Sequence, residues 1–234
     1  MSLFLRLPQN TAGRDFVVGD IHGAFDKVEE LLVMVGFDYN ADRLVSVGDL
    51  VDRGPDSDQA LDWLARPGFF AVMGNHELMA LAHACGGEEE AAGHIINGGE
   101  WMAPMAADIK REYAEAFARM PLAIEIPTPR GAVGVVHADI APGQSWQSLV
   151  SELEADSRES ANWLLWSRQR FESAMIGDST PDVAGIRRIY VGHTPVKEPL
   201  GVGNVSFIDT GLAFGGSLTL LNAHTGQIAA RVSA

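Results

Sequence analysis

Several apolar segments of the chain end in aspartate, histidine or asparagine, and these residue types at strand ends could bind metal ions. The clearest example is the motif GNHE at residues 74–77. Polar side chains that follow buried strands gather at the carboxyl edge of a sheet, where open α/β folds hold their sites. Four further apolar segments end similarly, although the last lacks a glycine directly before its histidine: residues 17–22, 45–49, 190–193 and 133–137. These five strand ends predict a metal centre.

The six candidate ligands form two sets, each of which combines oxygen and imidazole nitrogen donors. The first set is Asp20, His22 and Asp49, and the second is Asn75, His137 and His193. Such donors suit Mn, Fe or Zn. With Asp49 as the bridge, two cations could share a water, lower its pKa towards roughly 7 and stabilise both ends of an in-line displacement at phosphorus. An Asp after Gly can also simply form a turn, but five coordinated strand ends favour the metal centre.

The elements predicted around these residues are those of an α/β fold. Strands at residues 15–18, 44–47 and 69–73 alternate with helices at residues 24–35 and 59–65. This alternation predicts parallel strands joined by crossover helices. The remaining expected elements are a helical cap beside the site (residues 78–120), a hairpin (123–126 and 132–136), a second helical region (145–171), a loop (178–185) and three strands (188–191, 205–208 and 217–221). With no internal repeat or clear linker, residues 1–234 are expected to form a single domain.

Composition narrows the possible partners and the expected location of the protein. The formal charge of −14 argues against duplex nucleic acid and anionic membranes as partners, because both attract clustered Lys and Arg. A phosphate-bearing substrate would therefore be attracted locally, by metal ions and a few arginines. The single cysteine, Cys85, excludes an intrachain disulfide. The N-terminus lacks the apolar core of a signal peptide, and no segment approaches the roughly 18 apolar residues of a membrane span. We therefore expect a cytoplasmic enzyme.

Three motifs together resemble the signature of the metallophosphoesterase superfamily. They are GDIHG at residues 19–23, GDLVDRG at residues 48–54 and GNHE at residues 74–77. More narrowly, the chain resembles the phosphoprotein phosphatases, a group that includes bacterial and phage protein serine/threonine phosphatases. The family's two remaining histidine blocks and a motif of the phage-type enzymes also have counterparts here: residues 137–139 (HAD), 192–195 (GHTP) and 97–101 (NGGEW). The resemblance implies a calcineurin-like β-sandwich flanked by helices, with two divalent metal ions, commonly Mn.

By this resemblance Asp52, Arg53 and His76 are catalytic residues rather than metal ligands. His76 would protonate the leaving oxygen, while Asp52 orients its imidazole. Arg53 would bind two phosphate oxygens through its planar guanidinium. We expect strand alternation beyond Asn75 to direct His76 away from the ligand position.

A second phosphate-binding arginine is expected after the helical region. The motif WSR at residues 166–168 resembles the corresponding block and favours Arg168 over Arg170. The alternative is that Arg168 is an exposed helical arginine without a role in the site.

Five further residues with reactive or ligating side chains fall outside the main motifs. His83, His94 and His224 are interpreted as solvated or capping histidines. Cys85 is interpreted as a small buried thiol in an alanine-rich helix. Asp209 could support the metal ligands from behind or could simply form a turn.

The leading functional hypothesis is a metal-dependent phosphomonoesterase in which a hydroxide shared by two metal ions attacks phosphoserine or phosphothreonine in a protein or peptide. Phosphotyrosine and small phosphates are further candidate substrates. The first alternative is a symmetrical dinucleoside tetraphosphate hydrolase, but those relatives typically carry Ala where this chain has Asp52. The second alternative, a non-catalytic binding scaffold, would require a broken ligand set, whereas all six ligand positions are intact.

Overall fold

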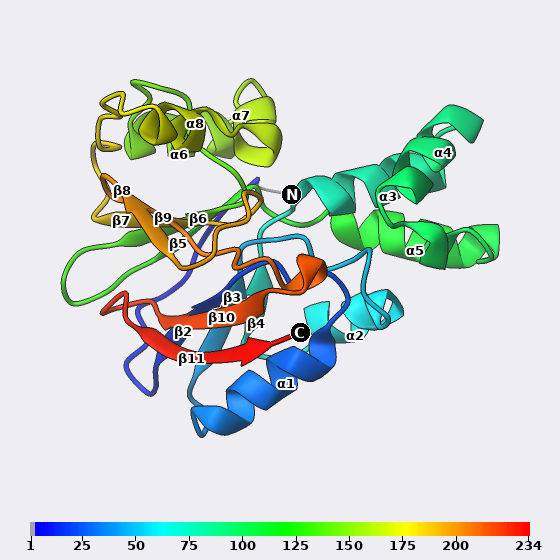
Figure 1. The fold of residues 1–234 in the computed structure, drawn as a ribbon, viewed down its shortest axis with the longest axis horizontal. Coiled ribbons are helices and arrows are strands. Elements are labelled where there is room, and N and C mark those ends of the chain that lie inside the picture. The colour runs from blue at the N-terminus through cyan, green and yellow to red at the C-terminus, as the bar shows by residue number, and fades with distance from the viewer. Residues whose placement is uncertain (1–2) are drawn as a thin grey trace.

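Two mixed β-sheets form the centre of the protein, and helices surround them (Figure 1). The computed structural model describes residues 3–234, so residues 1 and 2 of the expected domain lie outside it. The strand order is β11-β10-β2-β3-β4 in one sheet and β1-β5-β6-β7-β9-β8 in the other. This architecture confirms the expected sandwich of sheets flanked by helices. The assignment of residues 1–234 to a single domain stays a prediction.

The five-stranded sheet contains the predicted β-α-β-α-β unit. Strands β2 (Asp15–Val18), β3 (Arg43–Ser46) and β4 (Phe69–Ala71) are parallel, and helices α1 (Phe25–Met34) and α2 (Ala60–Leu64) connect them, the latter preceded by the 3-10 turn η1 (Ser57–Gln59). Strands β10 (Ser217–Asn222) and β11 (Ile228–Ser233) extend the sheet on the other side of β2 in antiparallel fashion. The carboxyl ends of the three parallel strands therefore share one edge of the sheet.

The six-stranded sheet is built around the predicted hairpin. Strands β5 (Ala123–Ile126) and β6 (Val133–Val136) are antiparallel, with Ile124 opposite Val135. Strand β7 (Arg188–Val191) pairs parallel to β6, so that their carboxyl ends also share one edge. The other members are β1 (Phe4–Arg6), β8 (Leu200–Val202) and β9 (Val205–Phe207).

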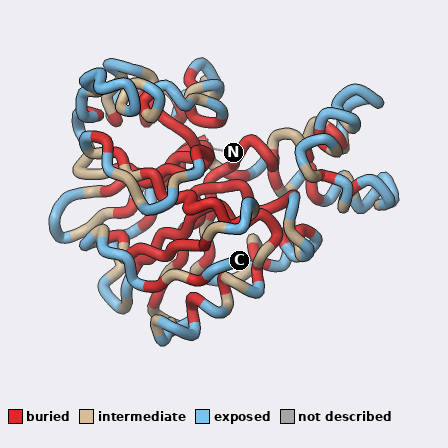
Figure 2. The backbone as a smooth tube through the Cα atoms, in the orientation of Figure 1, coloured by how far each residue is buried: buried red, intermediate tan, exposed pale blue. Residues whose placement is uncertain are grey.

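The core between the sheets explains why the central strands are apolar at consecutive positions. Val17 of β2 packs in a cluster with Ile124, Val135 and Tyr190 of the opposite sheet. Its neighbour Val18 belongs to the separate cluster that includes the helices outside the sandwich. Successive residues of a strand face opposite sides of the sheet, and here helices or the other sheet cover both sides. Figure 2 shows this buried centre in red, with exposed helix surfaces around it.

Two further groups of helices lie outside the sandwich (Figure 1). Helices α6 (Trp146–Glu154), α7 (Ala161–Trp166) and α8 (Gln169–Met175) form one group over the outer face of the six-stranded sheet. The other group projects from the body and is called the helical arm (residues 75–117); it contains α3 (Asn75–Cys85), α4 (Glu88–Ile96), the 3-10 turn η2 (Glu100–Met102) and α5 (Ala107–Phe117). The arm occupies most of the predicted cap. Within residues 3–234, no helix combines the length and apolar character needed to cross a membrane.

One substitution tests how tightly the six-stranded sheet packs against α6. A Cβ atom at Gly134 would lie 2.5 Å from the ring of Trp146, whose Nε1 donates a 2.6 Å hydrogen bond to Glu125. Because this buried ring is held in place, we expect Gly134→Ala to lower the free energy of unfolding by about 1–3 kcal/mol. The control is Gly201→Ala, since Gly201 is an exposed strand glycine with no atom within 4 Å of the added methyl. Denaturant unfolding of both variants is the measurement, and equal stabilities would contradict the packing described here.

Candidate metal centre

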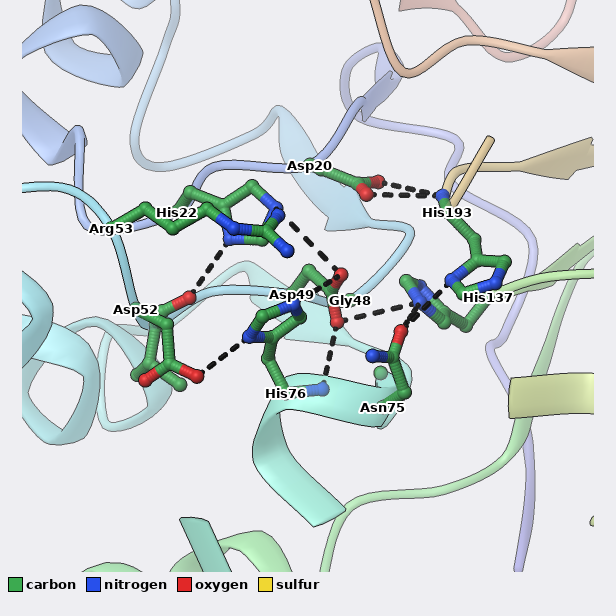
Figure 3. Close-up of polar contacts among 12 residues, drawn as sticks. Asp20, His22, Gly48, Asp49, Asp52, Arg53, Asn75, His76, His137 and His193 are labelled. Atoms are coloured by element: carbon green, nitrogen blue, oxygen red, sulfur yellow. Dashed lines mark hydrogen bonds and ion pairs between the residues drawn. The ribbon is translucent and has the colours of Figure 1, made fainter. Parts of the chain in front are cut away.

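The predicted ligands converge at one edge of the two sheets, although they come from distant parts of the sequence (Figure 3). Five of them follow the carboxyl ends of β2, β3, β6 and β7, and the sixth lies at the start of α3. All six side chains are buried: Asp20, His22, Asp49, Asn75, His137 and His193. They converge because parallel strands deliver their following loops to a common edge.

Asp49 lies between the two sets of ligands. Its Oδ1 is 3.3 Å from Nε2 of His137, and its Oδ2 is 3.7 Å from Nε2 of His22. Each carboxylate oxygen thus faces a different imidazole. This arrangement is the one that a bridging ligand requires, with one oxygen available on each side.

Two imidazole nitrogens of the second set converge on the amide oxygen of Asn75. Nε2 of His137 lies 2.8 Å from this oxygen, and Nδ1 of His193 lies 2.9 Å from it. The other ring nitrogens hydrogen-bond backbone carbonyls, His137 to Val47 at 2.8 Å and His193 to Trp166 at 3.1 Å. A neutral imidazole carries one N–H, so lone pairs face the Asn75 oxygen. A bound cation would resolve this convergence of acceptors.

His22 is oriented in the same way. Its Nδ1 donates to the carbonyl of Val51 at 3.0 Å, which leaves Nε2 as the acceptor that faces the site. In the structure this lone pair accepts a 2.7 Å hydrogen bond from Nη1 of Arg53. Backbone partners that fix the tautomer of a histidine are typical of metal ligands.

The electrostatics of the site also fit a bound cation. Burial lowers the pKa of His22 to about 4 and that of His193 to about 3, so both imidazoles are neutral, as ligands must be. Burial raises the pKa of Asp20 well above its usual value, and repulsion from Asp209 and Asp49 adds to the effect. Burial likewise raises the pKa of Asp209 to about 6. Divalent cations would offset the repulsion among these buried carboxyl groups, so the residues fit the expected metal centre.

Backbone strain is concentrated at this site. Within residues 3–234, six residues other than glycine have a positive φ, and five of these belong to the site: His22, Asp49, Asp52, Arg53 and His193. Such conformations cost free energy and persist where the surrounding structure enforces them, often at functional sites. The backbone is also closely packed directly before His193, because a Cβ at Gly192 would lie 1.9 Å from Oδ1 of Asp20.

His76 and Asp52 form a buried pair beside the ligands. Nδ1 of His76 lies 2.6 Å from Oδ2 of Asp52, and Nε2 of His76 is 3.9 Å from Oδ2 of Asp49. The His76 ring therefore donates to Asp52 and turns its other nitrogen towards the site. Burial lowers the pKa of His76, but the carboxylates of Asp49 and Asp52 outweigh it, and the net shift is upwards.

The expectation that strand alternation directs His76 away from the ligand position was wrong. Asn75 and His76 do not continue strand β4; they are the first two residues of α3, after the N-cap Gly74. Successive side chains of a helix are rotated by about 100°, which separates the directions of Asn75 and His76. Because His76 still lies near His22 and Asp49, the distances alone would also allow these three residues to bind an ion.

The structure distinguishes between Arg168 and Arg170, the two candidates for the second phosphate-binding arginine. Arg170 is buried and donates through Nε to Oδ1 of Asp139 at 2.9 Å, so its charge already has a partner. Arg168 is exposed and lines the recess in which Arg53 and Asp209 also lie. Of the two, Arg168 is therefore the one available to a ligand.

Four residues outside the main motifs differ from their sequence interpretation. His94 is buried and hydrogen-bonds Asp52 at 2.9 Å, so it is neither solvated nor a cap. His83 is buried against His94, and His224 bonds Asp15 at 2.9 Å. Cys85 is exposed at the end of α3 rather than buried. The spacing His83–His94 spans two helices and a turn, so no helical periodicity could have indicated the contact.

Comparisons with known proteins agree with this geometry. The family model for calcineurin-like phosphoesterases matches residues 16–207. Serine/threonine-protein phosphatase 1 of Salmonella typhimurium is 36% identical over 209 residues, which cover 88% of this chain and 89% of that protein. The symmetrical bis(5'-nucleosyl)-tetraphosphatase of Coxiella burnetii is 34% identical over 159 residues, which cover 67% of this chain and 50% of that protein.

A solved structure shares the fold. A crystal structure provisionally named a diadenosine tetraphosphatase matches with a TM-score of 0.68 and 24% sequence identity, covering 100% of this chain and 99% of that one. The family match and the Salmonella relative each extend over most of the chain, and they confirm both the expected resemblance and the expected hydrolase activity. The chain belongs to the calcineurin-like phosphoesterase family, whose members use a dimetal centre.

Proposed function

We propose that the protein is a metal-dependent phosphomonoesterase that hydrolyses phosphoserine and phosphothreonine in proteins or peptides. The observation that carries the proposal is the buried His76–Asp52 pair, joined at 2.6 Å, which faces the cluster of metal-ligand side chains. The similarity to a bacterial serine/threonine-protein phosphatase over most of both chains supports the same substrate class.

The six predicted ligands would hold two divalent cations. Asp20 and His22 would bind one ion, the second set would bind the other, and Asp49 would contact both. Mn is the metal that we propose, and the mixed oxygen and imidazole donors suit Fe or Zn as well. When bound, such ions supply an activated water and positive charge near the phosphoryl group.

Two arginines would bind the phosphate group of the substrate. Arg53 and Arg168 line the same recess as the metal-ligand side chains. The guanidinium of Arg53 lies over the ring of Phe214, 5.1 Å from its centroid, and this contact restricts its position. The local positive charge counteracts the repulsion that a chain of net charge −14 exerts on an anionic substrate.

His76 would act as the general acid. As the bond between phosphorus and the leaving oxygen breaks, the proton on Nε2 of His76 moves to that oxygen and the serine or threonine hydroxyl departs neutral. Asp52 accepts the Nδ1–H and thereby orients the ring and stabilises its charged form. This step requires that Nε2 of His76 faces the recess, as the geometry of His76 provides.

The alternative substrate is a symmetrical dinucleoside tetraphosphate, which the Coxiella relative is named for. A nucleotide leaving group is a weak base and departs with little help from an acid. A serine alkoxide is a strong base and must be protonated as it leaves. The buried His76–Asp52 pair is therefore of more use to a phosphomonoesterase, which is why we favour that function.

A comparison of substrates tests this choice. We expect the protein with Mn²⁺ to hydrolyse a phosphoserine peptide with a clearly higher kcat/KM than a dinucleoside tetraphosphate. The measurement is steady-state turnover of both substrates under the same conditions, with an aryl phosphate as the positive control for an active metal centre. The reverse ranking would favour the tetraphosphatase and leave the fold and the metal centre unaffected.

A second experiment tests the role of His76. General acid catalysis contributes about 10²–10⁴-fold, so we expect His76→Asn to lower kcat by that order with a phosphoserine peptide. With nitrophenyl phosphate, whose leaving group needs little protonation, the loss should be visibly smaller. The control is His137→Asn, which removes a proposed metal ligand and should impair both substrates alike. Bound metal is measured in each variant. If His76→Asn retains its metal but loses activity equally on both substrates, His76 is not the acid.

A further inference from the structure

The carboxylate of Asp52 has more hydrogen-bond partners than the pair with His76 requires. Its Oδ1 accepts from Nε1 of Trp101 at 2.6 Å, Nε2 of His94 lies 2.9 Å from Oδ1 and 3.0 Å from Oδ2, and Oδ2 also accepts from His76. The side chain is fully buried. Burial raises the pKa of Asp52, but its hydrogen bonds to His76 and His94 outweigh burial, and the net shift is downwards. Asp52 is therefore an ionised carboxylate held by three ring N–H donors.

The two additional donors come from the helical arm rather than from the sandwich. His94 lies near the end of α4, and Trp101 lies in η2, immediately after the turn that joins them. The arm projects to one side of the body in Figure 1, yet this part of it reaches back to the loop that follows β3. The segment of residues 94–101 is called the arm clamp below.

The protonation states along this contact follow from hydrogen-bond chemistry. A carboxylate only accepts, so Nε2 of His94 must carry the proton that it shares with Asp52. A lysine ammonium only donates, so Nε2 of His83, 3.2 Å from Nζ of Lys110, is an acceptor and Nδ1 carries the proton of that ring. Nδ1 of His83 therefore donates to Nδ1 of His94, 2.9 Å away. Burial and the nearby Lys110 lower the pKa of His83, which agrees with a neutral ring. All the N–H groups therefore point from the arm towards Asp52.

The arm clamp also holds the backbone beside Asp52. The backbone N–H of Arg53 donates to the carbonyl of Gly98 at 3.0 Å, and both Asp52 and Arg53 have positive φ angles, 74° and 69°. Gly98, with a φ of 101°, packs so closely that a Cβ there would lie 2.7 Å from Cγ of Arg53. The clamp thus contacts the side chain of one strained residue and the backbone of the next, as expected where a strained conformation is enforced by its surroundings.

We propose that His94 and Trp101 are positioning residues, which fix the carboxylate of Asp52 so that its Oδ2 holds His76 in the orientation needed to protonate the leaving group. The inference rests on the proposed function only for the identity of the reaction. The placement of His76 by the arm clamp can be measured without a substrate. Neither residue touches the reacting phosphate; each acts through Asp52.

The first test is kinetic and uses the dependence on the leaving group. Hydrogen bonds to charged groups contribute more free energy than those between neutral groups. We therefore expect His94→Leu and Trp101→Phe each to lower kcat about tenfold with a phosphoserine peptide. With nitrophenyl phosphate the decrease in kcat should be much smaller. His94→Gln, which retains an N–H donor of similar reach, should recover most of the loss. Bound metal and Tm are measured for every variant. Equal losses on the two substrates would reduce the arm clamp to a structural role and overturn the proposal.

The matched control is Tyr113→Phe. Tyr113 lies in α5, is buried, and donates its hydroxyl to the carbonyl of Asp58 at 2.6 Å. The substitution removes a buried hydrogen bond of the helical arm without touching Asp52. It should lower Tm while leaving the ratio of the two activities unchanged, because loss of stability alone does not discriminate between leaving groups. A change in that ratio for Tyr113→Phe would count against the proposal.

The second test needs no substrate. In protein with ¹⁵N-labelled histidine loaded with diamagnetic Zn²⁺, NMR should report His94 protonated at Nε2, His83 protonated at Nδ1, and a His76 Nδ1–H signal typical of a hydrogen bond to a carboxylate. The His76 signal should shift or broaden in His94→Leu but persist in Tyr113→Phe. If it is unchanged in both, the proposal is overturned whatever the activity. If it responds as expected but phosphoserine peptides are not hydrolysed, the proposed function fails while the positioning role stands.

Discussion

The convergence of buried acceptors around Asp49 is the constraint on which the rest of the site depends. The two oxygens of Asp49 face imidazoles on opposite sides, and Nε2 of His137 faces the Asn75 oxygen at 2.8 Å with no proton available between them. Unpaired acceptors in a buried site are costly, and cations that bind between them remove this cost. We therefore interpret the buried carboxylates and neutral imidazoles as a preformed binding site for two divalent cations.

The fold places residues from both sheets and from the helical arm at this one site. Parallel strands of both sheets bring their following loops to a common edge, where residues with positive φ, such as Asp49 and His193, direct their side chains inwards. The first turn of α3 adds Asn75 and His76. The helical arm also adds the hydrogen bonds of the arm clamp to Asp52.

Much of this arrangement could be predicted from the sequence, because it depends on local patterns. Apolar runs followed by Gly and Asp or His correctly indicated the strands before Asp20, Asp49 and His193. Three strands were missed, β1, β8 and β11, since two are only three residues long and the third begins with two exposed residues, which obscure its alternation. The start of α3 was missed because GNHE follows a strand so closely that it was assigned to the strand end.

The role of His94 could not be predicted for a different reason. It bonds Asp52 across 42 positions of sequence, and nothing in the residues around His94 indicates that the helix turns back to the site. Contacts of this kind depend on the packing of whole elements. For the second arginine, the motif WSR favoured Arg168 from the sequence, and the structure adds a physical reason, because Arg170 is paired with Asp139.

The most direct test of the metal centre is anomalous X-ray scattering from crystals grown with Mn²⁺, with data collected on both sides of the Mn absorption edge. The account predicts two anomalous peaks, one on each side of Asp49, the first beside Asp20 and His22 and the second beside His137 and His193. A single peak, or peaks away from Asp49, would contradict the central claim that this aspartate bridges two ions.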